Sequence, residues 1–268
     1  MHLKRWITGL VALPFLILLV YRGGILFTLL VTVACILSLG EYYRIVLAPG
    51  VKALSNLVAL WGYLISLIFL GAAHAQRPDL LLALMALNLL AVAFISLFRF
   101  KSDRTVMEAV KNQVQGIVYI PFFLSFLVLI RNDAAGMHWI FWLLCLIFAG
   151  DTSAYYVGSY WGRHKLAPAI SPGKTVEGAL GGLAANLVVG SVFKYYFLPE
   201  LPWGASILLF LTAGAAGQIG DLFESELKRL SNIKDSGGVL PGHGGILDRI
   251  DALLFAGPVA YFLKEYMF

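Results

Sequence analysis

The run DLLLALMALNLLAVAFISLF, residues 79–98, carries a single charge, on its first residue. An α-helix rises about 1.5 Å per residue, so a helix needs about 20 mainly apolar residues to cross the hydrocarbon core of a bilayer. This stretch has that length and that composition. It is therefore predicted to be a transmembrane helix.

The same pattern recurs along the whole chain. Of its 268 residues, 60% are hydrophobic and 13% are charged, whereas soluble domains average roughly 45–50% and about 25%. We therefore predict an all-α, polytopic membrane protein with about nine transmembrane helices. The predicted spans lie at 6–21, 24–40, 54–73, 79–98, 116–130, 138–158, 178–197, 204–220 and 250–266.

The distribution of positive charge predicts an orientation. Lys4 and Arg5 precede the first span, and most of the other lysine and arginine residues fall on the same side of the membrane. Positive residues concentrate in cytoplasmic loops, so the N-terminus is predicted in the cytoplasm and the C-terminus on the opposite side. The first span is interpreted as retained, because no small-residue cleavage site separates it from the second. The net charge of +5 is attributed to a basic face that attracts anionic lipid, and no nucleic-acid partner is predicted.

The two halves of the chain differ in their polar residues. Residues 1–135 are predicted to form a scaffold of transmembrane helices, and residues 136–268 a transmembrane catalytic domain. In the first half, Glu41-Tyr-Tyr-Arg44 is interpreted as a solvated or headgroup-facing helix end, and residues 99–111 as a short amphipathic helix at the interface. The chemistry is expected in three polar clusters of the second half, all on the predicted cytoplasmic side.

The first cluster is AGDTSAYYVGSYWGRHK, residues 149–165. Asp151 lies within or beside an apolar helix, where an ionised group costs at least ~2.5–3.5 kcal/mol unless it is paired or faces water. A buried aspartate satisfied by a neighbouring helix is the alternative. The cost favours a functional role, and Asp151 is predicted to complete a polar cavity.

The second cluster is SPGKTVEG, residues 171–178. Pro172 and Gly173 favour a turn, and residues 175–178 are typical of a helix start, where free backbone N–H groups attract anions. Lys174 stands beside that start. The segment is not a P-loop, because the earlier glycine is missing at the required spacing and no strand is predicted before it. It is predicted to hold phosphate, although such a short pattern also arises by coincidence.

The third cluster runs from QIGDLFES, residues 218–225, to GGVLPGHGGILDRID, residues 237–251. Asp221 is predicted to end the eighth span, and Asp248 and Asp251 to begin the ninth. Residues i and i+3 share a helix face, so these carboxylates can converge on one Mg²⁺ ion, which prefers oxygen ligands. The glycine pairs let the backbone approach a ligand without obstruction by a Cβ. An ordinary loop before a capped helix would explain one aspartate and one arginine, but not the whole cluster.

The polar positions of this third cluster resemble the signature of phosphatidate cytidylyltransferases, also called CDP-diacylglycerol synthases. The resemblance covers about residues 145–268, and the two earlier clusters follow in the expected order. The matching residues are Ser225, Lys228, Arg229, Lys234, Asp235, Gly237 to Pro241, His243, Gly244, Gly245, Asp248, Arg249, Ile250 and Asp251.

This resemblance implies an activity and a setting. The family transfers CMP from CTP to phosphatidic acid in phospholipid biosynthesis, and the products are CDP-diacylglycerol and pyrophosphate. The resemblance implies a binuclear centre with Mg²⁺ and a monovalent cation such as K⁺. It also implies a homodimer in contact with membrane lipids, of the bacterial inner-membrane type, with its active site facing the cytoplasm.

Position and resemblance together predict roles for individual residues. The phosphate of phosphatidate is already anionic near neutral pH, so charge neutralisation and positioning are expected to matter more than a general base. The predicted metal ligands are Asp221, Asp248 and Asp251. The predicted catalytic residues are Asp221, Asp248, Lys234, Asp235, Arg249 and Asp251. The predicted substrate-binding residues are Asp151, Ser171, Lys174, Thr175, Glu177, Lys228, Arg229 and His243.

Other functions account for part of the pattern. A transporter would place polar residues near the bilayer midplane and show inverted repeats, but the polar residues here gather on one face and no repeat is visible. A CDP-alcohol phosphotransferase would carry a DG and AR motif with spaced aspartates in one helix, which is absent. A cytidylyltransferase for a different lipid, such as an ether-linked phosphatidate, stays open.

Overall fold

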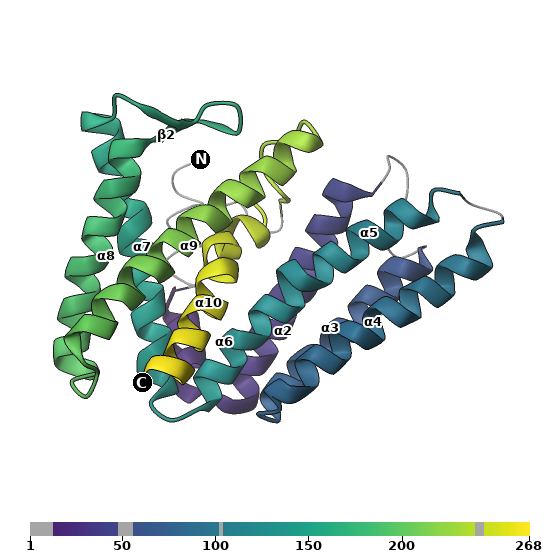
Figure 1. Cartoon of the computed structure of the whole chain (residues 1–268), viewed down its shortest axis with the longest axis horizontal. Helices are drawn as coiled ribbons and strands as arrows, with labels where there is room; N and C mark the ends of the chain where they lie inside the picture. The colour runs from purple at the N-terminus through teal and green to yellow at the C-terminus, as the bar shows by residue number, and fades with distance from the viewer. Residues whose placement is uncertain (1–12, 48–55, 102–103, 239–243) are drawn as a thin grey trace. The chain divides into compact units, whose positions relative to one another are not determined.

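The computed structural model describes residues 13–47, 56–101, 104–238 and 244–268, and these are almost entirely helical (Figure 1). Within the described residues, seven helices are long and apolar enough to cross a membrane. They correspond to the second to eighth predicted spans. The all-α, multi-pass architecture predicted from the apolar runs is therefore confirmed.

The first and last predicted spans are not among these seven. The first is described only as the apolar helix Leu13–Arg22, because residues 1–12, with Lys4 and Arg5, lie outside the described residues. The last forms α10 (Leu247–Met267), which is long enough to cross a bilayer but carries charged residues near both ends. The count of nine and the orientation therefore stay predictions.

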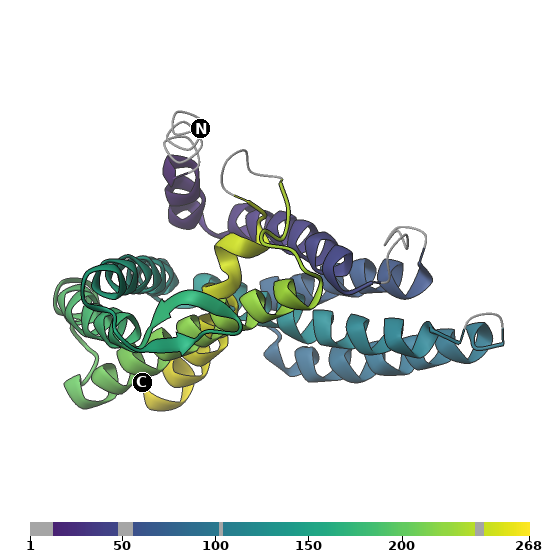
Figure 2. The same ribbon diagram turned by 90° about the horizontal axis from the view of Figure 1, so that it is seen from above.

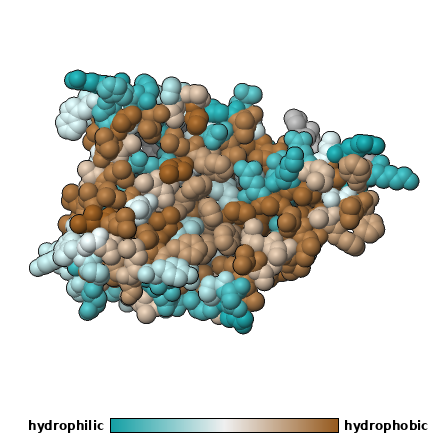
Figure 3. Space-filling model, in the orientation of Figure 1, coloured by the Kyte–Doolittle hydropathy of each residue, from teal (hydrophilic) through white to brown (hydrophobic). Residues whose placement is uncertain are grey.

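Large apolar side chains cover the outer faces of the spans. On α4 (Pro78–Arg99), Leu82 is 79% exposed and Leu97 is 75% exposed. Figure 3 shows apolar residues over the flanks of the helices and hydrophilic residues toward their ends. A soluble protein rarely exposes large contiguous apolar patches, whereas a lipid environment favours them.

The described chain forms two compact units. Unit 1 comprises Met1–Asp133 with Asp235–Asp248, and unit 2 comprises Ala134–Lys234 with Arg249–Phe268. The stretch Asp235–Asp248 thus groups with the N-terminal helices, although it is far from them in sequence. The functional division predicted at residue 135 stays a prediction.

Unit 1 is a bundle in which α3 contacts every other helix named below. The helices α3, α4 and α5 run side by side (Figure 2) and share a buried polar triad. Trp61 Nε1 donates to Asn88 Oδ1 at 3.0 Å, and the amides of Asn88 and Gln113 exchange hydrogen bonds of 2.8 and 3.2 Å. Such bonds satisfy polar groups that lipid cannot. The elements are α2 (Gly24–Val46), α3 (Leu57–His74), α4, α5 (Val106–Ile117), the π-helical turn η2 (Val118–Phe122) and α6 (Phe123–Asn132).

The fifth span begins earlier than predicted. Residues 106–111 do not form a separate interfacial helix, because α5 continues through η2 and α6 as one apolar stretch, Val106–Asn132. The apolar side of α5 buries Val106 and Val110 against Val58 of α3 and Val92 of α4. The separate short helix predicted for residues 99–111 was therefore wrong, because residues 106–111 are the start of a longer helix. Their place at the membrane interface stays a prediction.

In unit 2, a small β-hairpin connects two long helices, α7 and α8. Helices α7 and α8 pack along their length, and a Cβ on Gly178 of α8 would lie only 2.7 Å from the carbonyl oxygen of Ala154 on α7. Small residues allow such close helix contacts in membranes. The elements are α7 (Gly136–Trp161), β1 (Lys165–Ala167), β2 (Ser171–Thr175), α8 (Val176–Phe197), α9 (Trp203–Leu230) and most of α10.

One local prediction in unit 2 was wrong. No strand was predicted before the segment 171–178, yet β1 precedes it, and residues 171–175 themselves form β2, which pairs antiparallel with β1. The segment is still not a P-loop, because the earlier glycine of that motif is missing at the required spacing. Asp221 was predicted to end the eighth span, and the helix that contains it, α9, continues beyond Asp221 to Leu230. Hydropathy marks where the apolar run stops, whereas a helix can continue into polar sequence.

Candidate active site

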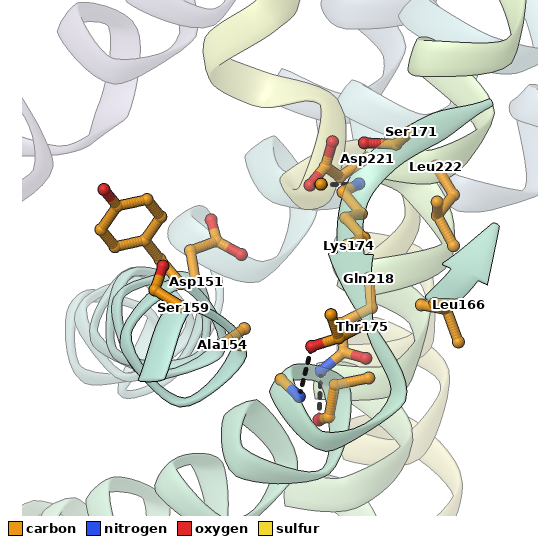
Figure 4. A pocket seen from close by; sticks show the side chains of 15 residues that line it. Asp151, Ala154, Ser159, Leu166, Ser171, Lys174, Thr175, Gln218, Asp221 and Leu222 are labelled. Carbon is orange, nitrogen blue, oxygen red and sulfur yellow. Dashed lines mark hydrogen bonds and ion pairs between the residues drawn. The ribbon is translucent and has the colours of Figure 1, made fainter. Parts of the chain in front are cut away.

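A cavity of about 530 Å³ lies within unit 2, lined by α7, the β-hairpin, the start of α8, and α9 (Figure 4). Its volume falls in the range of small-molecule pockets, roughly 300–1,000 Å³. Five of the residues predicted from the sequence line it together. They are Asp151, Ser171, Lys174, Thr175 and Asp221.

The centre of the cavity wall is an ion pair between Lys174 of β2 and Asp221 of α9. The Lys174 Nζ atom lies 2.7 Å from Asp221 Oδ2, and both side chains are half-buried. Figure 4 shows the pair between the hairpin and α9. The sequence predicted that both residues belong to the site, but it did not predict that they contact each other.

Three carboxylates of unit 2 lie close enough for their charges to interact. The charge of Asp221 acts on both Asp151 and Asp251, and Asp151 also acts on Asp251. Lys174 and Lys228 provide positive charge near the same group. Because like charges repel, this arrangement favours the binding of a further cation.

A glycine allows the C-terminal helix to bring Asp251 to this group. A Cβ on Gly220 of α9 would lie 2.5 Å from the backbone oxygen of Asp251 on α10. The glycine therefore permits close approach of the two helices directly beside Asp221. The prediction that Asp221 and Asp251 lie near each other is consistent with this contact.

The hairpin joins α8 through a capped helix start. Thr175 has extended backbone angles, and its Oγ1 accepts a hydrogen bond of 3.1 Å from Gly178 N. This is an N-cap, and it lies within residues 175–178, where a helix start was predicted. Lys174 directly precedes this N-cap residue.

Glu177 supports the other end of the hairpin and does not line the cavity. Its carboxylate accepts hydrogen bonds from the backbone N–H groups of Arg163 at 3.0 Å and His164 at 3.1 Å. It also lies 2.6 Å from His164 Nδ1. These contacts attach the segment before β1 to the first turn of α8, so Glu177 holds the hairpin in place.

The basic residues after Asp221 that were predicted to bind substrate or assist catalysis do not line the cavity. Lys228 forms a buried ion pair with Glu224, one helical turn earlier on α9. Arg229 Nε donates to Ile170 O at 3.0 Å, and its Nη1 donates to Ile233 O at 3.2 Å. Arg229 thus links the hairpin turn to the end of α9, while the exposed Lys234 and Arg249 do not line the cavity.

The remaining predicted residues lie in unit 1 or outside the described residues. Asp248 is in the first turn of α10, and its Oδ2 accepts from Ser236 N at 3.1 Å and Gly245 N at 2.8 Å. Asp235 is exposed, and His243 is not among the described residues. Because Asp221 and Asp248 belong to different units, their convergence stays a prediction.

Asp221 and its neighbouring carboxylates provide the oxygen ligands that Mg²⁺ prefers, but they do not form a complete set of ligands. Within the described ranges, no group of three or more His, Cys, Asp or Glu side chains is arranged to hold a metal. Mg²⁺ usually binds through one or two carboxylates and completes its shell with water and substrate phosphate. Asp221 and its neighbouring carboxylates offer oxygen donors of that kind.

Sequence reasoning overlooked several residues that line the cavity, among them Gln218 and Tyr155. Gln218 lies three positions before Asp221, and its Nε2 donates to Ala179 O at 2.9 Å. Residues at i and i+3 share a helix face, so Asp221 itself was a signal for Gln218. Tyr155 follows Asp151 by four positions on α7 and also lines the cavity, and the same spacing rule would have found it.

Replacing Glu177 by glutamine is expected to weaken the binding of the soluble substrate without stopping turnover. The amide loses the charge that attracts the N–H groups of Arg163 and His164, so the hairpin that carries Lys174 becomes less fixed. We expect the KM for that substrate to rise by less than about fivefold, because exposed ion pairs contribute little. Steady-state kinetics would check this, with the exposed Glu226→Gln as control, and a fall in kcat at unchanged KM would contradict it.

Comparison with known proteins identifies the family to which this chain belongs. The profile of the cytidylyltransferase family matches residues 3–267. A phosphatidate cytidylyltransferase of Bacillus subtilis (strain 168) is 36% identical over 269 residues, which cover 97% of this chain and 96% of that protein. Proteins of the same name from Staphylococcus aureus (strain COL) and Staphylococcus haemolyticus (strain JCSC1435) are 30% and 31% identical, over 95% and 98% of this chain and 96% and 99% of their own lengths. The chain therefore belongs to the cytidylyltransferase family, in the group of the phosphatidate cytidylyltransferases.

Proposed function

We propose that this protein transfers CMP from CTP to phosphatidic acid, with CDP-diacylglycerol and pyrophosphate as products. The observation that carries the proposal is the cavity of unit 2, where Lys174 and Asp221 form an ion pair beside a capped helix start. Relatives that match almost the whole chain are named for this activity. The proposal includes ether-linked phosphatidates as alternative acceptors.

The reaction requires two anions to meet. A phosphate oxygen of phosphatidate attacks the α-phosphorus of CTP, a new P–O bond forms, and the bond to the β-phosphate breaks, so that pyrophosphate leaves. The nucleophile is already ionised near neutral pH, since the second pKa of such phosphate monoesters is about 6. The protein therefore needs to supply positive charge and alignment, and no strong general base.

The residues of the cavity can supply both. Lys174 lies on the hairpin wall, where its ammonium can neutralise triphosphate oxygens, and the hydroxyls of Ser171 and Thr175 lie on the same strand. Thr175 also fixes the start of α8, whose backbone N–H groups favour anions. Arg229 holds the hairpin turn through Ile170, so its proposed contribution to phosphate binding is indirect, through the position of the hairpin.

Magnesium is proposed as the cofactor, with K⁺ as a candidate second cation. The residues that would hold Mg²⁺ are Asp221, Asp248 and Asp251, with Asp151 nearby in the charge group of unit 2. When bound, the ion neutralises phosphate oxygens and orients the α-phosphate for in-line attack. Lys228, Lys234, Asp235, Arg249 and His243 are proposed to assist with pyrophosphate or with the lipid headgroup.

The setting of the site is part of the proposal. A water-soluble nucleotide and a membrane lipid can meet only at the membrane surface, and positive loops concentrate on the cytoplasmic side. We therefore place the site on the cytoplasmic face of a bacterial inner membrane. A homodimer is proposed on the resemblance alone.

A direct assay tests the proposed reaction. The purified full-length protein in detergent is incubated with radiolabelled CTP and phosphatidic acid, with and without Mg²⁺, and lipid-extractable label is counted. We expect label that depends on Mg²⁺, and we expect Asp248→Asn to reduce it by about 10²-fold. Absence of label in folded wild-type protein, with ester-linked and ether-linked phosphatidates alike, would overturn the proposal.

A further inference from the structure

Glu41 is a buried carboxylate that the sequence analysis assigned to a solvated helix end. The structure contradicts that assignment, because α2 continues to Val46 and Glu41 is only 1% exposed. An ionised group without solvent is costly unless it is hydrogen-bonded. Its partners therefore indicate why a carboxylate is placed there.

Three hydrogen-bond donors to Glu41 come from the stretch Asp235–Asp248, about 200 residues later in the chain and in the same compact unit. Leu247 N donates to Oε2 at 2.8 Å, Ile246 N donates to Oε1 at 3.1 Å, and Ser236 Oγ donates to Oε2 at 3.1 Å. Two of these donors are backbone groups at the start of α10, which have no partner inside the helix. Glu41 thus caps α10 from a distant segment.

Ser236 connects Glu41 to Asp248. Its hydroxyl donates to Glu41, while its backbone N–H donates to Asp248 Oδ2 at 3.1 Å. Gly245 N donates to the same Asp248 oxygen at 2.8 Å and precedes the two N–H groups bound by Glu41. Each of the two carboxylates therefore joins Ser236 to the segment 245–247: Glu41 through Ile246 and Leu247, and Asp248 through Gly245.

The glycines of this loop are required by the closeness of the two carboxylates. A Cβ on Gly237 would lie 2.3 Å from Glu41 Oε1, and one on Gly245 would lie 2.4 Å from Glu41 Oε2. Gly244 has a φ of +78°, and its Cβ would lie 2.6 Å from Asp248 Oδ2. Side chains at these positions would separate the loop from both acids, so Gly237 and Gly245 allow the contact with Glu41 on α2, and Gly244 allows the contact with Asp248.

We propose that Glu41 is a positioning residue for Asp248, and that it fixes the orientation in which Asp248 binds Mg²⁺. The inference rests on the proposed function, in which Asp248 is a metal ligand. Glu41 acts through the loop: it holds the N–H groups of Ile246 and Leu247, and through Ser236 it orders the donors that orient Asp248. Partners that orient a metal ligand typically affect metal affinity or activity by about 10–100-fold when they are changed.

The variant Glu41→Gln removes the charge while nearly preserving the volume. The glutamine amide retains one acceptor oxygen, and its NH₂ group meets the loop N–H groups that the second oxygen bound. We expect the Mg²⁺ concentration for half-maximal rate, and the Mg²⁺ concentration that half-maximally raises the melting temperature, to increase by about tenfold or more. We expect kcat to fall, while the KM for CTP changes little. Glu108→Gln is the matched control, because Glu108 is exposed on α5 of the same unit, and it should behave as wild type.

The Mg²⁺ response separates positioning from simple destabilisation. A purely structural role for Glu41 would lower the yield and the melting temperature of the protein, but the folded fraction would keep the wild-type Mg²⁺ midpoint. That result would overturn the inference. Wild-type protein measured in parallel shows whether the proposed reaction itself occurs, so the failure of one proposal is distinguished from the failure of the other.

A second variant decides the case if Glu41→Gln does not fold. Ser236→Ala leaves both carboxylates in place and removes only the hydroxyl that joins them. We expect its Mg²⁺ midpoint to rise in the same direction by a smaller factor, and Glu41→Asp, which keeps the charge, to recover part of the loss if it folds. A Ser236→Ala protein that folds and has the wild-type Mg²⁺ midpoint would contradict the inference.

Discussion

Replacing Asp221 by asparagine is expected to lower kcat/KM for CMP transfer by about 10² to 10³-fold. The side chain lies at the centre of the carboxylate group of unit 2, where its charge acts on both Asp151 and Asp251, and it forms an ion pair with Lys174. Asparagine keeps the shape but removes the charge that a divalent cation needs. The release of labelled CDP-diacylglycerol, measured as a function of both substrates, checks this expectation.

The loss should not come from unfolding. Asp221→Asn breaks an attraction to Lys174, but it also removes repulsion from Asp151 and Asp251. These two effects oppose each other, so the melting temperature without Mg²⁺ is expected to change little. The exposed Asp79→Asn in unit 1 is the control for an Asp-to-Asn change. An Asp221→Asn enzyme with activity near that of wild type would exclude a central role for this carboxylate.

Replacing Lys174 by methionine is expected to reduce kcat/KM by about 10²-fold and to raise the KM for CTP. Methionine keeps the apolar stem of the side chain but cannot neutralise a phosphate oxygen. It also removes the ion pair of Lys174 with Asp221, which lies near two other carboxylates. The triphosphate would then enter a more negative cavity.

The hairpin itself provides the control for this variant. Lys165 is exposed on β1, pairs with Thr175 only through the strand register, and does not line the cavity. Lys165→Met should therefore keep the KM for CTP within about twofold of wild type, as expected for an exposed charge. Equal losses in the two variants would mean that the general charge of the hairpin matters, and not the position of Lys174 beside Asp221.

Much of the site was predictable because its residue types are unusual in an apolar chain. Asp151, Lys174 and Asp221 stood out as polar residues next to predicted spans, and the structure places all three around one cavity. Thr175 was predicted at a helix start, and it caps α8. In each case a local rule about membrane cost or helix capping was sufficient.

The contacts between these residues were not predictable from local rules. Residues 171–175 contain Pro172 and Gly173, which are more typical of a turn, yet they form a strand because β1 supplies the paired backbone. Glu41 looked like an ordinary charge at the end of a span, and its partners lie about 200 residues away. Hydropathy reports the side chain and its neighbours in sequence, and it carries no information about a distant partner.

The sequence by itself determined that the chain is a helical membrane protein, and its polar clusters predicted that the chemistry lies in the second half. These properties follow from the cost of exposing polar backbone and charge to lipid, which each segment meets on its own. Only the tertiary structure decided that Lys174 contacts Asp221 and that Glu41 caps α10. Those arrangements depend on the packing of segments remote in sequence, where a buried charge is stable only if another segment brings its hydrogen-bond partners.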